Sequence, residues 1–66
     1  MTEVRIVIER VEDGYLATAY DEVGPLGQRF SSMQMVAAAG ARLIARDKIA
    51  DIEEILFRVE EIDRAE

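Results

Sequence analysis

The chain of 66 residues contains no cysteine, no histidine and a single proline. The lack of cysteine excludes a disulfide framework and a cysteine nucleophile, and the lack of histidine removes the commonest general base and metal ligand. No stretch has the ~18 apolar residues of a membrane span or the layout of a signal peptide. We therefore expect a cytoplasmic domain that contacts no membrane, is not an enzyme, and uses neither a metal nor a cofactor.

Acidic residues outnumber basic residues by 14 to 8, which gives a net charge of −6. The excess is concentrated at one end, because residues 47–66 carry 8 acids and only 3 bases. Binding to a phosphate backbone needs clustered Lys and Arg, so direct contact with nucleic acid is not expected. The charge distribution instead predicts a basic protein partner.

The N-terminal half predicts a small antiparallel sheet. β-Branched residues alternate between two faces from Glu3 to Val11, which is typical of a strand. Asp13-Gly14 is a strong hairpin signal, because glycine accepts the positive φ of tight turns. Tyr15 to Tyr20 then returns antiparallel, and Gln28 to Phe30 could add a short third strand at the edge. The predicted sheet lies within residues 3–30.

A helix is predicted over residues 31–46, because Ser31 followed by Gln34 fits a capping box. Gly40 in its middle costs about 1 kcal/mol against alanine, which indicates a close approach to the small-residue face of the second strand. Met33 and Met35 are expected in the core or on the helix surface; only if both were exposed would they indicate an adaptable binding surface. The predicted apolar stripe comprises Met33, Val36, Ala37, Gly40, Leu43 and Ile44.

Residues 47–64 allow two interpretations. Six apolar residues between Ile49 and Ile62 follow helical spacing with acidic residues between them, which favours a second helix. The competing interpretation is a strand at Ile55–Val59 with alternate residues on one face. With the helix favoured, the predicted fold class is α+β: an antiparallel hairpin or three-stranded sheet packed on one helix and followed by a second, acidic helix, in a single domain over residues 1–66.

The candidate functional surface is the acidic C-terminal segment. Its carboxylates could dock onto a basic partner and accelerate encounter, although most acidic helix faces are simply solvated. Acid pairs elsewhere, such as Glu12-Asp13 and Asp21-Glu22, are typical of solvated turns, so no catalytic, metal-binding or cofactor-binding residue is predicted. The broad apolar stripe of the expected helix also predicts a homodimer. The candidate partner-binding residues are Glu53, Glu54, Phe57, Glu60, Glu61 and Asp63.

The order of motifs in residues 3–46 resembles the HicB family of small antitoxins. The resemblance is carried by Asp13-Gly14-Tyr15-Leu16-Ala17, by Glu22 and Gly24 after it, and by a capped, alanine-rich helix from Ser31. It implies a partial RNase H fold without nuclease residues. Tyr20 and Val23 depart from the family pattern, which usually has prolines there, and residues beyond Arg46 cannot hold a whole DNA-binding module.

The resemblance implies a protein inhibitor that neutralises a small, basic, RNA-cleaving toxin of the HicA type without itself binding operator DNA. Two other classes stay open at this stage. One is a phage-encoded inhibitor of the anti-CRISPR type, which would act as an acidic nucleic-acid mimic. The other is a plain structural homo-oligomer.

Overall fold

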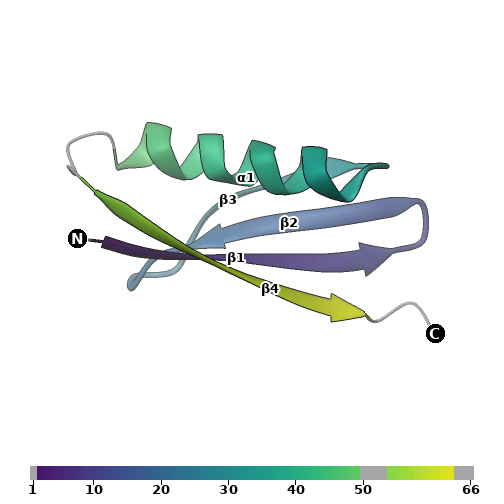
Figure 1. The fold of residues 1–66 in the computed structure, drawn as a ribbon, viewed down its shortest axis with the longest axis horizontal. Coiled ribbons are helices and arrows are strands. Elements are labelled where there is room, and N and C mark those ends of the chain that lie inside the picture. Colours follow the sequence, from purple (N-terminus) through teal and green to yellow (C-terminus); the bar gives the residue numbers. More distant parts are fainter. Residues whose placement is uncertain (1, 50–53, 64–66) are drawn as a thin grey trace.

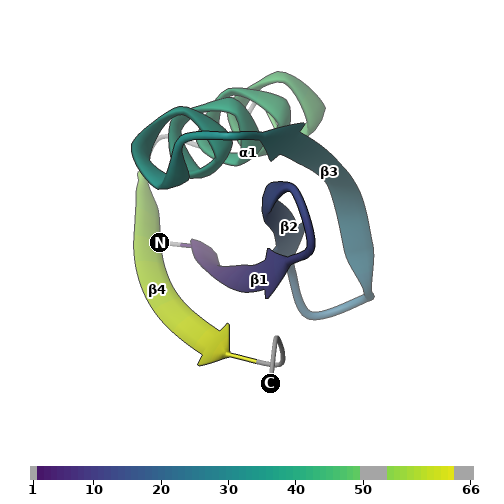
Figure 2. The ribbon, with the colours of Figure 1, turned by 90° about the vertical axis from the view of Figure 1, so that its right-hand side faces the viewer.

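The computed structural model describes residues 2–49 and 54–63, which form one sheet and one helix. Strands β1, β2 and β3 form an antiparallel meander, and β4 returns parallel to β1 at the edge, so the sheet order is β3-β2-β1-β4. The helix α1 lies on one face of this curved sheet (Figure 1, Figure 2). The elements are β1 (Thr2–Val11), β2 (Gly14–Tyr20), β3 (Pro25–Ser31), α1 (Gln34–Lys48) and β4 (Ile55–Asp63).

The predicted second helix is wrong, and so is the fold class that included it. The described part of the C-terminal segment forms β4, whose nine residues pair with β1 without interruption. Phe57 pairs with Val4 and Val59 pairs with Ile6, so the face they share continues the core face of β1. β-Branched and aromatic residues fit such a pleated surface. The competing strand interpretation of residues 55–59 was therefore the correct one.

The predicted hairpin between β1 and β2 is confirmed, but Gly14 serves it in a different way from the one expected. Among the described residues, positive φ occurs only at Gly24 and Gly27. At Gly14 the requirement is space: a Cβ would lie 2.5 Å from the carbonyl oxygen of Ser31 and 2.8 Å from Cα of Ser32. Glycine thus lets the start of β2 pass close to the backbone that leads into α1.

The core consists of larger residues from β1 packed against alanines. Val4 and Ile6 are fully buried. Small residues on both β2 and α1 allow the helix to approach the sheet closely. The predicted apolar stripe of the helix is correct for Ala37, Gly40 and Ile44, which face the sheet. It is wrong for its other three members: Met33 is exposed, and Val36 and Leu43 are 50% and 66% exposed. The buried residues are Val4, Ile6, Ile8, Ala17, Ala19, Ala37, Ala38, Ala41 and Ala45.

The start of α1 differs from the predicted capping box. The N-cap residue is Met33, and no side chain caps the helix. The hydroxyl of Ser31 accepts a hydrogen bond from the backbone N–H of Met33 at 3.1 Å. Gln34 reaches across to β4 instead, where its amide donates to Glu61. The helix consequently begins later than expected, at Gln34, and ends later, at Lys48.

Two glycines hold α1 close to β3. A Cβ on Gly40 would lie 2.6 Å from Cγ of Arg29, and a Cβ on Gly27 would lie 2.7 Å from Cγ2 of Ile44. The close approach predicted at Gly40 is thus present, but its neighbour is a side chain of β3 and not the small-residue face of β2. The opposite edge of the sheet is covered less, because Val59 of β4 faces the helix side and is still 44% exposed.

Candidate functional site

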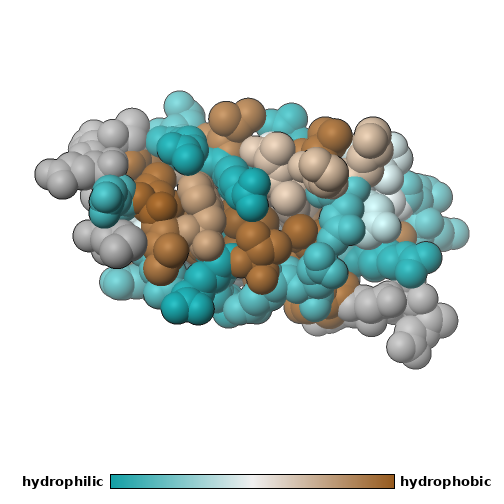
Figure 3. Space-filling model, in the orientation of Figure 1, coloured by the Kyte–Doolittle hydropathy of each residue, from teal (hydrophilic) through white to brown (hydrophobic). Residues whose placement is uncertain are grey.

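The outer side of α1 carries a row of exposed apolar side chains. Met35 is 82% exposed in the first turn of α1, and Leu43 is 66% exposed in its C-terminal half. Apolar atoms reach the surface over α1 and over β4 in the same view (Figure 3). Exposed apolar residues that gather on one element indicate an interaction surface more strongly than scattered ones do. We name this surface the α1 ridge, and it comprises Met33, Met35, Val36 and Leu43.

The α1 ridge meets the condition stated above for the two methionines. Met33 and Met35 are both exposed, and unbranched thioether side chains adapt to partner surfaces of different shape. Sequence reasoning missed Val36 and Leu43 as surface residues, because helical spacing placed them on the same stripe as Ala37. The signal available in the sequence was the alternative stripe of alanines at 37, 41 and 45, which identifies the face that packs closely against a sheet.

The acidic residues predicted to bind a partner do not form one continuous face. Because side chains alternate along a strand, Glu60 lies on the side of the sheet opposite α1, and Glu61 lies on the side of α1. Glu54 is exposed just before β4, where its backbone carbonyl accepts a hydrogen bond from Thr2. Asp63 is the last residue of β4, and Glu53 lies outside the described residues.

On the side of the sheet opposite α1, which we call the open face, charges are largely paired. Arg5 lies 3.6 Å from Glu60 and stacks over the ring of Tyr20 at 5.4 Å. Arg58 forms an ion pair with Glu3. All four side chains of these ion pairs are about half exposed, so each pair contributes roughly 0–1 kcal/mol. Their main consequence is that the open face presents alternating charges and not a sheet of carboxylates.

Phe57 supports the fold from the helix side of β4. Its ring packs against the core and lies beneath the guanidinium groups of Arg42 and Arg46, at 5.9 and 5.4 Å from the ring centroid. A cation over an aromatic face is attracted by the ring quadrupole. Phe57 therefore links β4 to α1, and only part of its surface is left for a partner.

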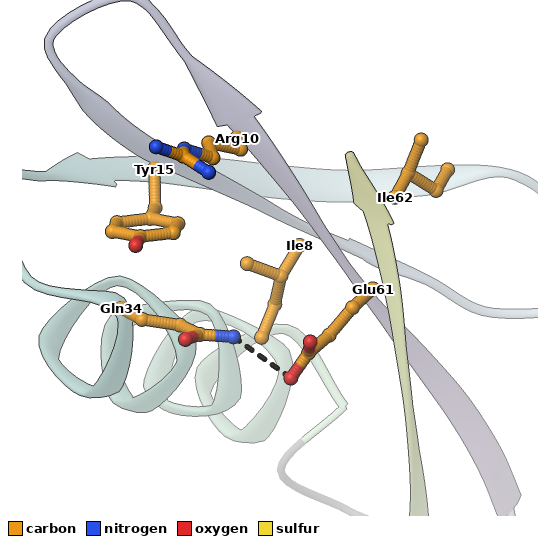
Figure 4. Close-up of a pocket in the computed structure, with 6 residues that line it drawn as sticks. All are labelled: Ile8, Arg10, Tyr15, Gln34, Glu61 and Ile62. Carbon is orange, nitrogen blue, oxygen red and sulfur yellow. Dashed lines mark hydrogen bonds between the residues drawn. The ribbon is translucent and has the colours of Figure 1, made fainter. Parts of the chain in front are cut away.

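A hollow of about 270 Å³ lies where the start of α1 faces the end of β4. Tyr15 and Ile8 form part of its wall, and the amide of Gln34 donates a 2.8 Å hydrogen bond to Glu61 across it (Figure 4). Ile62 points to the other side of β4 in this view. The lining brings together one carboxylate, one guanidinium, one phenol and one amide. Such a set suits hydrogen bonding to a polar group of a partner at the foot of the α1 ridge.

The acid pairs predicted to lie in turns are found there. The carboxylate of Asp21 accepts hydrogen bonds from the backbone N–H groups of Val23 and Gly24, at 2.8 and 3.1 Å. This arrangement stabilises the turn between β2 and β3. Glu12 and Asp13 are exposed in the hairpin turn. Within residues 2–49 and 54–63, no cluster of three acidic side chains is arranged to hold a metal ion.

Comparison with protein-family models, with curated proteins and with solved structures finds no match to this chain. Function is therefore inferred from its own residues and geometry, together with the family resemblance described above. None of the described residues belongs to a helix with the length and apolar character needed to cross a membrane.

Proposed function

We propose that this chain is a non-enzymatic, cytoplasmic inhibitor of the antitoxin type, which binds and neutralises a basic protein that handles nucleic acid. A HicA-type RNA-cleaving toxin is the leading candidate for that partner. The α1 ridge supplies the apolar contact, and the exposed carboxylates of the C-terminal segment select a partner of opposite charge. Inhibition follows from covering the surface on which the partner binds RNA.

The observation that carries the proposal is the orientation of α1. The helix buries alanines and directs Met35, Val36 and Leu43 outward, an arrangement that leaves large apolar side chains in water in the isolated chain. Burying each such side chain against a partner recovers up to about 1.5–3 kcal/mol. A helix that exposes an apolar face to solvent commonly binds another protein through that face.

The charge of the chain supports a basic partner. The net charge is −6, and Glu61 extends from β4 on the same side of the sheet as α1. Charges around an apolar contact mainly raise the association rate and reject partners of like charge. The order of strand, Asp-Gly turn, strand, third strand and helix in residues 2–48 also agrees with the order of elements that the HicB resemblance implies.

The anti-CRISPR-type alternative is supported less. An acidic mimic of nucleic acid needs carboxylates that remain unneutralised along one surface. On the open face, Glu60 and Glu3 are each paired with an arginine. This leaves the side of α1 as the better candidate for contact, where the apolar α1 ridge is flanked by Glu61 and by the exposed bases Arg42, Arg46 and Lys48.

The proposal is tested by expressing the tagged chain in its native host, purifying it, and identifying co-purified proteins by mass spectrometry. The expected result is one small basic protein, held at a constant ratio to the chain and lost when Leu43→Lys disrupts the α1 ridge. Leu43 is exposed, so this variant should fold normally, and Glu12→Lys serves as a control for added charge at a distant exposed site. Retention of the same protein by the Leu43→Lys variant would contradict the role of the ridge.

A further inference from the structure

The two edges of the sheet are built differently. At β3, Pro25 lacks an N–H donor, the pairing with β2 shifts register between Ala19 and Tyr20, and Gly27 interrupts the row of side chains. These are common devices that protect an edge from pairing with another strand. At β4, nine consecutive residues keep one register with β1 and include neither proline nor glycine. The β4 edge is therefore a regular strand that carries none of these backbone devices.

From this contrast we propose that a second copy of this chain pairs its β4 with the β4 edge, antiparallel, about a two-fold axis that passes through Val59. The two sheets then form one continuous sheet of eight strands, with both helices on the same side. This inference does not rest on the proposed function, because it uses the backbone edge of β4 and leaves the α1 ridge uncovered.

The sequence of β4 is complementary to itself about Val59. A two-fold axis perpendicular to a sheet pairs each residue with one on the same face, so positions on either side of the axis exchange. On the open face this sets Arg58 opposite Glu60 of the second copy, twice, and Leu56 opposite Ile62, also twice. Opposite charges and apolar pairs directly across from each other stabilise antiparallel strands.

Neighbouring registers lose this complementarity. An axis at Arg58 or at Glu60 sets that residue opposite its own copy, which places like charges in direct contact. An axis at Phe57 sets Arg58 opposite Leu56 and shortens the paired region of β4. Among these registers, only the axis at Val59 pairs both charged residues that β4 places on the open face with opposite charges.

Val59 itself also favours a partner at this position. It faces the helix side of the sheet next to fully buried Ile6, yet it is 44% exposed. Leu56 and Ile62, on the open face of the same strand, are 42% and 36% exposed. A second β4 placed alongside would shield part of each of these side chains. Both faces of β4 thus gain apolar contact from the same pairing.

The register is tested with single cysteine variants, which report cleanly because the chain has no other cysteine. At the axis, the Cα atoms of Val59 and its copy lie about 4.5–5.5 Å apart, within the range that a disulfide bridges. Under mild oxidation, Val59→Cys is expected to form a covalent dimer. Glu61→Cys, on the same face two residues along, serves as the matched control and should remain monomeric on a denaturing gel. In the proposed register position 61 of each copy lies opposite Phe57 of the other, so the two cysteines are too far apart to form a disulfide. Equal cross-linking of the two variants would overturn the proposed register.

Sedimentation of the unmodified chain at micromolar concentration gives the second readout. The expected species has twice the 7.4 kDa mass of the chain. Val59→Lys places two ammonium groups at the axis and should weaken the dimer by roughly tenfold or more, whereas Leu43→Lys on the α1 ridge should leave it unchanged. Thermal melts of both variants verify folding. A monomeric unmodified chain, or a dimer dissociated by Leu43→Lys alone, would overturn the inference.

Discussion

Arg29 of β3 lies directly against Gly40 of α1, so that a Cβ on the glycine would lie 2.6 Å from Cγ and 3.1 Å from Cβ of the arginine. The side chain of Arg29 therefore occupies the space that a side chain at position 40 would need. Gly40→Ala gains about 1 kcal/mol of helix propensity but meets crowding that costs about 1–3 kcal/mol. We expect the free energy of unfolding to fall by about 1 kcal/mol, as measured by urea denaturation.

A double-mutant cycle separates crowding from other causes. In an Arg29→Ala background, Cγ of Arg29 is absent, and Gly40→Ala should be more favourable by about 1 kcal/mol than in the unmodified chain. Additive effects of the two substitutions would show that the contact with Arg29 does not determine the stability of the Gly40→Ala variant.

Gly14→Ala should be more damaging than Gly40→Ala. The obstacle at Gly14 is the backbone of Ser31 and Ser32, which cannot rotate away as a side chain can. We expect a loss of about 2–3 kcal/mol, near the upper end of the cost of overpacking. Thermal melts of the two variants under one condition check the order, and a Gly14→Ala variant at least as stable as the unmodified chain would contradict the close approach.

Phe57 and Val59 should differ in their effect on stability although both face the helix side of β4. Phe57 packs against the core and beneath two guanidinium groups, so Phe57→Ala should cost about 2–3 kcal/mol. Val59→Ala should cost less than about 1 kcal/mol in the monomer, because Val59 is 44% exposed. Chemical denaturation at low protein concentration measures both. Similar losses at the two positions would argue against Phe57 as the link between β4 and α1.

Neutralising the acids of the C-terminal segment should slow association with a basic partner. Replacing Glu54, Glu60 and Glu61 with glutamine and Asp63 with asparagine removes four negative charges from exposed or strand positions. The association rate should fall at low salt, and the difference from the unmodified chain should shrink as salt screens the charges. Binding kinetics at two salt concentrations provide the measurement. A difference that persists unchanged at high salt would indicate a structural effect in place of an electrostatic one.

The meander of β1, β2 and β3 followed by a helix could be predicted from local pattern. The alternation from Glu3 to Val11 has a single interpretation, and Asp13-Gly14 identifies the turn. The C-terminal segment could not be resolved in this way, because Ile55, Phe57 and Val59 fit a strand while the wider set of apolar residues fits a helix. Pairing with β1, which is distant in the sequence, decides between the two.

The candidate surface was harder to predict than the fold. Helical spacing grouped Val36 and Leu43 with the residues expected to face the sheet, but the bulk of Val4, Ile6 and Ile8 on β1 already fills much of the core. Alanines then pack best on the facing side of α1, and the larger residues turn outward. The predicted acidic residues remain candidates for partner binding, but the alternation of a strand divides Glu60 and Glu61 between two faces.

The most direct test of the proposed function is the rate at which the co-purified basic protein cleaves RNA, measured while the chain is added in increasing amounts. Inhibition by the antitoxin mechanism predicts that RNA cleavage falls to background at a fixed molar ratio of the chain to the basic protein. The Leu43→Lys variant should be needed in larger amounts than the unmodified chain for the same inhibition, whereas the Glu12→Lys variant should not. Cleavage that continues at the same rate in the presence of excess chain would contradict the account.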